Sequence, residues 1–138
     1  VYQAGTLSGN PLATTAGLAT LRGATPEVYA HIDKVSGQVR EEVSRALDAA
    51  GVVHRLHSGG NLFTVFFTDQ EVVDFDTART TDTAVFSAFF HAMLDQGVYL
   101  PPAAFEAWFL SAAHDDTAID RVVSALPKAA RAAAEAQG

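Results

Sequence analysis

Residues 52–68, VVHRLHSGGNLFTVFFT, decide the fold class of this chain. Two runs rich in β-branched and aromatic side chains, at 52–57 and 62–68, are typical of β-strands. Between them, residues 58–61 read Ser-Gly-Gly-Asn, which favours a turn. The stretch therefore predicts two antiparallel strands joined as a hairpin.

Two helices are predicted before this hairpin. Asn10-Pro11 and Thr25-Pro26 each place a capping residue before a proline at the first helical position, where the missing N–H has no cost. The first helix is predicted to end near Arg22, and the second runs to a terminating Gly51. Apolar residues in the second helix recur at spacings of three and four: Val28, Ile32, Val35, Val39, Val43, Leu47 and Ala50.

Two further helices are predicted after the hairpin. Residues 82–96 place a phenylalanine cluster on one helical face, and a last helix begins near Asp115. We expect its alanine-rich tail, residues 127–138, to fray at its end. Residues 69–81 are polar and predict an irregular segment.

Two short strands are predicted between these helices, at 98–100 and 107–111. Pro101-Pro102 ends the first, because proline cannot donate to a β ladder. The order of elements predicts an α+β fold, with helices covering one face of an antiparallel or mixed sheet.

The composition argues against several classes of protein. The 138 residues carry a formal charge of −7, which opposes binding to nucleic acid or to an anionic membrane. The absence of cysteine excludes a disulfide scaffold, a thiolate metal site and a cysteine nucleophile. No apolar run approaches the roughly 20 residues of a membrane span. We therefore expect one globular, cytoplasmic domain.

The first candidate site is the segment that leads into the first helix. Gly5, Thr6, Ser8 and Asn10 combine small residues, hydroxyl groups and a helix N-terminus, which together can bind an anion such as phosphate. The alternative is an ordinary capped loop that enters a helix.

The second candidate is Glu106, a lone carboxylate between Phe105 and Trp108. Burial among aromatic rings would disfavour its charged form and suit it to proton transfer or to binding an amino group. The alternative is an exposed loop glutamate. The five histidines show no spacing typical of metal ligands, so we predict no metal site. No serine lies in a nucleophile-elbow motif, so we predict no serine hydrolase site.

Several longer segments resemble a known enzyme family in order and spacing. These are residues 1–21, VYQAGTLSGNPLATTAGLATL; residues 61–69, NLFTVFFTD; and residues 82–116, which contain FFHAMLDQGVYL and FEAWFLSAAH. Together they are similar to the C-terminal third of the glutamate-1-semialdehyde 2,1-aminomutases, which are class III pyridoxal-phosphate aminotransferases of fold type I. The first segment is shared with related aminotransferases, whereas the last is more particular to the aminomutases.

The resemblance implies an enzyme that isomerises glutamate-1-semialdehyde to 5-aminolevulinate for tetrapyrrole and haem synthesis. The cofactor would be pyridoxal 5′-phosphate, recycled through pyridoxamine 5′-phosphate, in a homodimer whose phosphate site is shared between subunits. Gly5 and Thr6 would contact the partner's cofactor phosphate, and Glu106 would lie near substrate or cofactor. Ser8 and Tyr2 are weaker candidates, placed beside the cofactor and the substrate by their neighbours.

The resemblance also implies that residues 1–24 are the end of the phosphate loop and a connecting helix, and residues 25–138 a small domain. We expect a fragment without the large cofactor domain, and hence without its Schiff-base lysine, because Lys34 and Lys128 fall on predicted helix surfaces. Alone, it should be inactive. Ala103, Ala104 and Trp108 depart from the family pattern around the pocket. Two alternatives stay open: another class III aminotransferase, and a free-standing, non-catalytic interaction module.

Overall fold

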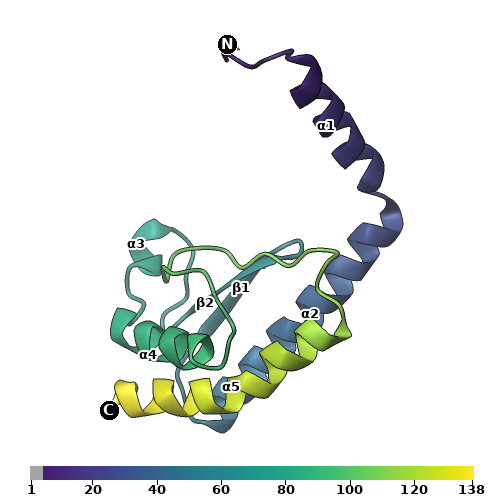
Figure 1. Cartoon of the computed structure of the whole chain (residues 1–138). Coiled ribbons are helices and arrows are strands. Elements are labelled where there is room, and N and C mark those ends of the chain that lie inside the picture. Colours follow the sequence, from purple (N-terminus) through teal and green to yellow (C-terminus); the bar gives the residue numbers. More distant parts are fainter. Residues whose placement is uncertain (1–4) are drawn as a thin grey trace.

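The computed structural model describes residues 5–138 of the chain, which form five helices and a two-stranded sheet (Figure 1). The elements are α1 (Pro11–Gly23), α2 (Pro26–Ala49), β1 (Arg55–Gly59), β2 (Leu62–Phe66), α3 (Phe75–Ala78), α4 (Thr83–Leu94) and α5 (Asp116–Gln137). The predicted α+β class is confirmed. Helix α5 packs against both α2 and α4, and the hairpin of β1 and β2 lies against this helical layer (Figure 1).

The hairpin forms where the sequence predicts it, with a tighter turn. Gly59 pairs with Leu62, so the loop has only two residues, Gly60 and Asn61. Gly60 has φ +64°, a conformation that glycine adopts without steric cost. Ser58 and Gly59 are therefore strand residues, although both were predicted to lie in the turn.

One apolar core joins α2, the hairpin, α4 and α5. Its largest fully buried side chains are Phe89, Leu47, Met93, Ile119, Leu126, Val43 and Val85. The periodic apolar positions predicted for α2 and the phenylalanine cluster predicted for 82–96 supply much of this list. Leu94, which was predicted on the same face as that cluster, is 40% exposed, because it lies in the last turn of α4.

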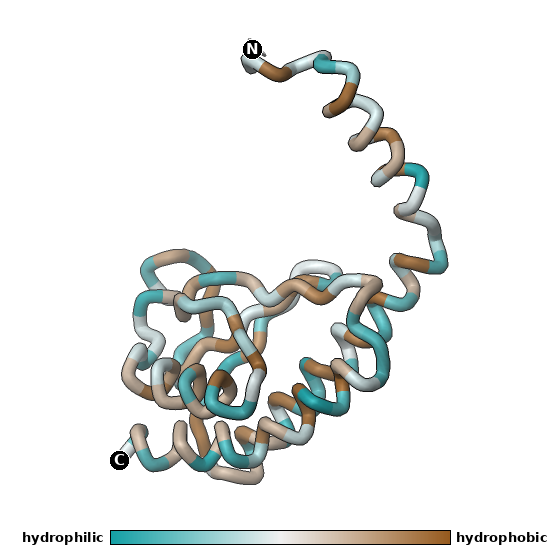
Figure 2. Tube along the Cα trace, in the orientation of Figure 1, coloured by the Kyte–Doolittle hydropathy of each residue, from teal (hydrophilic) through white to brown (hydrophobic). Residues whose placement is uncertain are grey.

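Helix α1 is the exception, because none of its residues is buried. It extends away from the body in Figure 1, and hydrophilic colour in Figure 2 is largely confined to its two ends. The predicted capping is confirmed: Asn10 Oδ1 accepts from the backbone N–H groups of Leu12 at 3.0 Å and Ala13 at 3.3 Å. A helix with so few charged side chains normally lies against other protein.

Two predicted strands are wrong. Residues 98–100 form no strand, and residues 107–111 make only an isolated bridge between Trp108 and Phe63. Val98, Leu100 and Trp108 are nevertheless buried. Their apolar pattern reports burial, and the adjacent prolines remove the N–H donors that a longer ladder requires.

Two smaller predictions are also corrected. The segment 69–81 contains the short helix α3, which begins at Asp74 because its carboxylate accepts from Thr77 N–H at 2.8 Å. The tail is ordered: α5 continues through Pro127 to Gln137, and three of its alanines are buried (Ala129, Ala130 and Ala133). At its end, Gln137 Oε1 accepts from Val53 N–H at 3.1 Å.

Candidate functional site

The segment before α1 is a compact, exposed turn. Ser8 N–H donates to the carbonyl of Gly5 at 3.0 Å, and Asn10 N–H donates to the carbonyl of Leu7 at 3.0 Å. A Cβ built on Gly5 would lie 2.8 Å from Ser8 Oγ, so glycine at position 5 leaves room for the Ser8 hydroxyl in this orientation. The close approach places the Ser8 hydroxyl directly over the backbone of Gly5.

The free donors of this turn suit an anion. Asn10 already occupies the first amides of α1, so those amides are engaged by its side chain. The hydroxyl groups of Thr6 and Ser8 are exposed and have no hydrogen bond within residues 5–138. An anion would therefore be bound by these hydroxyls and the turn backbone. Tyr2, the other residue predicted in this segment, lies outside the described residues.

Glu106 lies in the irregular segment between α4 and α5, and its backbone is tied on both sides. Its N–H donates to the carbonyl of Ala103 at 3.2 Å, and its carbonyl accepts from Thr64 Oγ1 at 3.4 Å. Two residues later, Trp108 N–H donates to the carbonyl of Phe63 at 2.7 Å. The segment is therefore fixed to β2.

The side chain of Glu106 is exposed. Within the described residues, Glu106 is therefore not buried among aromatic rings, the environment that the sequence had suggested for it. Phe105 is 46% exposed, while Trp108 is 5% exposed and turned into the core. Glu106 makes no ion pair within residues 5–138. Its carboxylate is available to groups outside this part of the chain.

Phe105 and Phe109, which are close to Glu106 in the sequence, are also exposed. Phe109 is 68% exposed, and Phe105 contacts Phe75 of α3 with ring centroids 6.0 Å apart. Such an apolar surface is typical of an interface with other protein.

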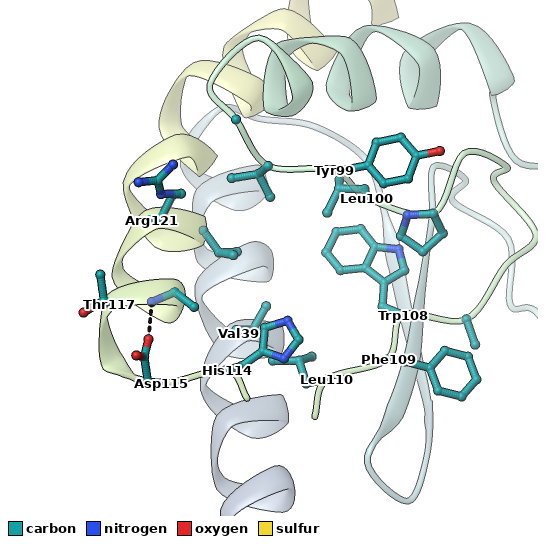
Figure 3. Close-up of a pocket in the computed structure, with 16 residues that line it drawn as sticks. Val39, Tyr99, Leu100, Trp108, Phe109, Leu110, His114, Asp115, Thr117 and Arg121 are labelled. Carbon is teal, nitrogen blue, oxygen red and sulfur yellow. Dashed lines mark hydrogen bonds between the residues drawn. The ribbon is translucent and has the colours of Figure 1, made fainter. Parts of the chain in front are cut away.

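A pocket of about 670 Å³ lies behind the Glu106 segment, between α2, α5 and residues 97–110. Figure 3 shows Trp108, Leu110 and Val39 on its walls, with His114 between them and Arg121 on α5. The walls are mostly apolar. Glu106 itself does not line this pocket, although its neighbours Ala107 and Trp108 do.

The structure does not bring the two candidate sites together. The turn at 5–10 lies at the far end of α1, whereas Glu106 belongs to the body of the molecule (Figure 1). Within one chain, residues 5–138 therefore do not form a single site from both groups.

The histidines have structural partners. His54 bridges the carbonyl of Val52 at 2.9 Å and Ser44 Oγ at 3.1 Å, and His31 Nε2 lies 3.0 Å from the carbonyl of His114. Across residues 5–138 no group of three potential metal ligands is found, and no helix could span a bilayer. Lys34 and Lys128 are both exposed on helices.

The contact between Thr64 and Glu106 could not be predicted from the sequence. Thr64 belongs to the predicted strand 62–68, but nothing in the alternation of that strand indicates a bond to residue 106. The residues around Glu106 gave no local signal either, because Ala104 and Trp108 are buried while both Phe105 and Glu106 between them are exposed.

No family model matches the chain. It is 57% identical over 136 residues to the glutamate-1-semialdehyde 2,1-aminomutase of Cutibacterium acnes (strain DSM 16379 / KPA171202), a match that covers 98% of this chain and 31% of that protein. The chain thus spans about a third of the length of this curated relative.

Solved transaminase structures share the fold. An omega-transaminase from Sphaerobacter thermophilus superposes with a TM-score of 0.78 at 23% identity, over 96% of this chain and 30% of that one. A transaminase with PLP bound gives a TM-score of 0.77 at 22% identity, over 100% of this chain and 31% of that one. The chain therefore has the fold of one part of these transaminases, and in sequence it is similar, nearly end to end, to about a third of a glutamate-1-semialdehyde 2,1-aminomutase.

Proposed function

We propose that this chain is part of a glutamate-1-semialdehyde 2,1-aminomutase, an isomerase that converts glutamate-1-semialdehyde to 5-aminolevulinate for tetrapyrrole and haem synthesis in the cytoplasm. The observation that carries the proposal is the 57% identity to such an enzyme over 98% of the chain. The transaminase structures are under 25% identical and support the fold alone.

The turn before α1 fits the phosphate of pyridoxal 5′-phosphate or pyridoxamine 5′-phosphate. Gly5 permits the close approach of Ser8, and the exposed hydroxyls of Thr6 and Ser8 are suitable donors to phosphate oxygens. When bound, the cofactor would supply the electron sink for rearranging the substrate's amino group. The role of these three residues is to bind the phosphate and orient the group.

Glu106 is proposed to act on the substrate side. Its carboxylate oxygens are exposed and unpaired within the described residues, so they are free to bind an amino group. Tyr2 is proposed to lie beside the substrate as well. Both roles follow from the similarity to the aminomutase.

The separation of the two sites supports a homodimer. Since one chain holds its turn far from its own Glu106, a complete site would combine the turn of one subunit with the remainder of another. Residues 1–24, including α1, would then connect the phosphate loop to the small domain formed by residues 25–138. The exposure of α1 along its whole length fits a helix that is buried in the assembly.

The 138 residues alone are expected to be inactive. Covalent binding of the cofactor needs an amine in the site, and both lysines of the chain are exposed on α2 and α5. A longer protein would have to supply that lysine and the carboxylate that pairs with the cofactor's ring nitrogen.

The test is product analysis on the natural gene product that contains these residues. Its intact mass and its cofactor absorbance are measured first. It is then incubated with glutamate-1-semialdehyde and no second substrate, and 5-aminolevulinate is assayed. Formation of that product supports the aminomutase. A requirement for an external keto acid would identify a different class III aminotransferase, and a 138-residue product without cofactor would identify a non-catalytic module.

A further inference from the structure

We propose that Thr64 and Trp108 are positioning residues for Glu106, which they hold on the surface of the small domain at a fixed place relative to β2. This inference rests on the proposed function, because it assigns Glu106 to the substrate site.

The first support is the pattern of anchors around Glu106. Ala104 and Trp108, two residues to either side, are 4% and 5% exposed, whereas Glu106 is exposed. Two buried residues therefore fix the ends of a short segment, and the residue midway between them points outward. The diproline before this segment further restricts its backbone.

The second support is the set of hydrogen bonds to β2. The backbone N–H of Trp108 donates to the carbonyl of Phe63 at 2.7 Å, and Thr64 Oγ1 donates to the carbonyl of Glu106 at 3.4 Å. Consecutive residues of one strand thus hold both Glu106 and the residue two positions after it. β2 is itself paired with β1 and has Phe63, Val65 and Phe66 buried, so it is a rigid support.

The third support is the packing of the indole. The ring of Trp108 lies 5.1 Å from Phe63 and 6.4 Å from Phe89 between centroids. It therefore joins the Glu106 segment to both β2 and α4. Figure 3 shows the same ring forming a wall of the pocket behind the segment. A smaller side chain would open that pocket and free the segment from its support.

The experiment is a double-mutant cycle in the natural gene product, loaded with cofactor and assayed for isomerisation. The single variants are Thr64→Val, which removes only the hydroxyl, and Glu106→Gln. We expect Thr64→Val to lower kcat about tenfold with little change in KM, as misplacement of a reacting group does. In the Glu106→Gln background the same substitution should have no further effect, because it acts through that carboxylate.

Trp108→Leu and Trp108→Phe extend the test. Trp108→Phe should retain most of the kcat that Trp108→Leu loses, because it keeps an aromatic contact with Phe63. Thr68→Val is the matched control. It removes a hydroxyl that contacts Thr80 Oγ1 at 2.9 Å, away from this segment, and should leave kcat of the folded enzyme unchanged.

The outcomes separate the two proposals. If the unmodified gene product does not isomerise glutamate-1-semialdehyde, the proposed function fails. If it does, and Thr64→Val leaves kcat unchanged or lowers it equally in the Glu106→Gln background, the positioning role is overturned. An unchanged kcat in Glu106→Gln also overturns it, since there would then be no carboxylate function to position.

Discussion

Phe67 and Thr81 are joined by a buried hydrogen bond, in which the backbone N–H of Phe67 donates to Thr81 Oγ1 at 2.8 Å. The carbonyl of Phe67 in turn accepts from Asp82 N–H at 2.8 Å. The chain leaving the hairpin is thereby fixed to the two residues that precede α4, of which Asp82 is the helix cap. Since both Phe67 and Thr81 are buried, water cannot replace either partner.

Thr81→Val should therefore destabilise the fold, because it leaves the buried N–H of Phe67 without an acceptor. An unsatisfied buried donor costs about 1–3 kcal/mol in the free energy of unfolding. Urea denaturation followed by the emission of the single tryptophan measures this change. Thr81→Ser keeps the hydroxyl and should recover most of the loss. Equal midpoints for Thr81→Val and the parent would show that this bond contributes nothing.

The tail of α5 gives a second test, since its alanines let the helix approach its neighbours closely. Ala133 is fully buried. Ala133→Leu should overpack this contact and destabilise the fold by about 1–3 kcal/mol. Ala136→Leu, at an exposed position of the same helix, is the control and should have little effect. If the two variants unfold alike, the tail is frayed as its composition suggested.

The short helix α3 should depend on pH through Asp74. Hydrogen bonds from the backbone N–H and the hydroxyl of Thr77 lower the pKa of Asp74 below its usual value. A carboxyl whose pKa is lowered by folding stabilises the folded form above its unfolded pKa, and this stabilisation is lost as the pH falls through the folded pKa. Acid should therefore open α3 locally.

Amide hydrogen exchange at Thr77 is the measurement for this prediction. Its protection should be present at neutral pH and decrease in acid, and Asp74→Ala should abolish it at every pH. Asp76→Asn, which removes a neighbouring acidic side chain of α3 outside the capping box, is the matched control. Protection that is unchanged in Asp74→Ala would contradict the capping role.

The fold could be predicted wherever a local pattern and its tertiary environment agreed. Asn10, Asp82 and Asp115 cap their helices with side-chain oxygens, as their positions predict. Thr25 makes no such cap, and the start of α2 is marked by Pro26 alone. The strands at 98–100 and 107–111 could not be distinguished from buried loop, because an apolar side chain reports burial whether or not its backbone is paired. The alanine-rich tail suggested fraying, yet α5 continues through Pro127 to Gln137, since alanines beyond the proline are buried by tertiary packing.

The candidate site was less predictable for the same reason. The sequence indicated Gly5, Thr6, Ser8 and Glu106 as candidates, but not that α1 would hold the turn away from the body that contains Glu106 (Figure 1). Nor could it indicate that Glu106 would be exposed while Trp108, two residues away, became its buried anchor. Such information depends on contacts between distant segments, here β2 and residues 104–108.

The exposed helix α1 predicts that the 138-residue chain self-associates. Leu12 and Leu21 are 80% and 74% exposed, and α1 carries no charged side chain before Arg22. Apolar surface of this kind seldom stays free in water. Sedimentation should show dimers or larger species that dissociate on dilution, and Leu12→Ser with Leu21→Ser should shift the chain toward monomer. Leu94→Ser, at an exposed leucine of α4, is the control. A monomer at every concentration would contradict this.

The turn before α1 predicts a defined effect of a single methyl group on cofactor binding. In Gly5→Ala the new Cβ would lie 2.8 Å from Ser8 Oγ, so the Ser8 hydroxyl must rotate away from its present position over residue 5. In the natural gene product we expect pyridoxal 5′-phosphate to dissociate at least about tenfold faster, because the loss of one hydrogen bond to an anion costs about 1.5–3 kcal/mol. Cofactor absorbance after dilution measures this rate. Gly17→Ala, on α1 where a Cβ meets nothing within 4 Å, is the matched control. If both variants keep the cofactor equally well, the turn is only the capped entrance to a helix.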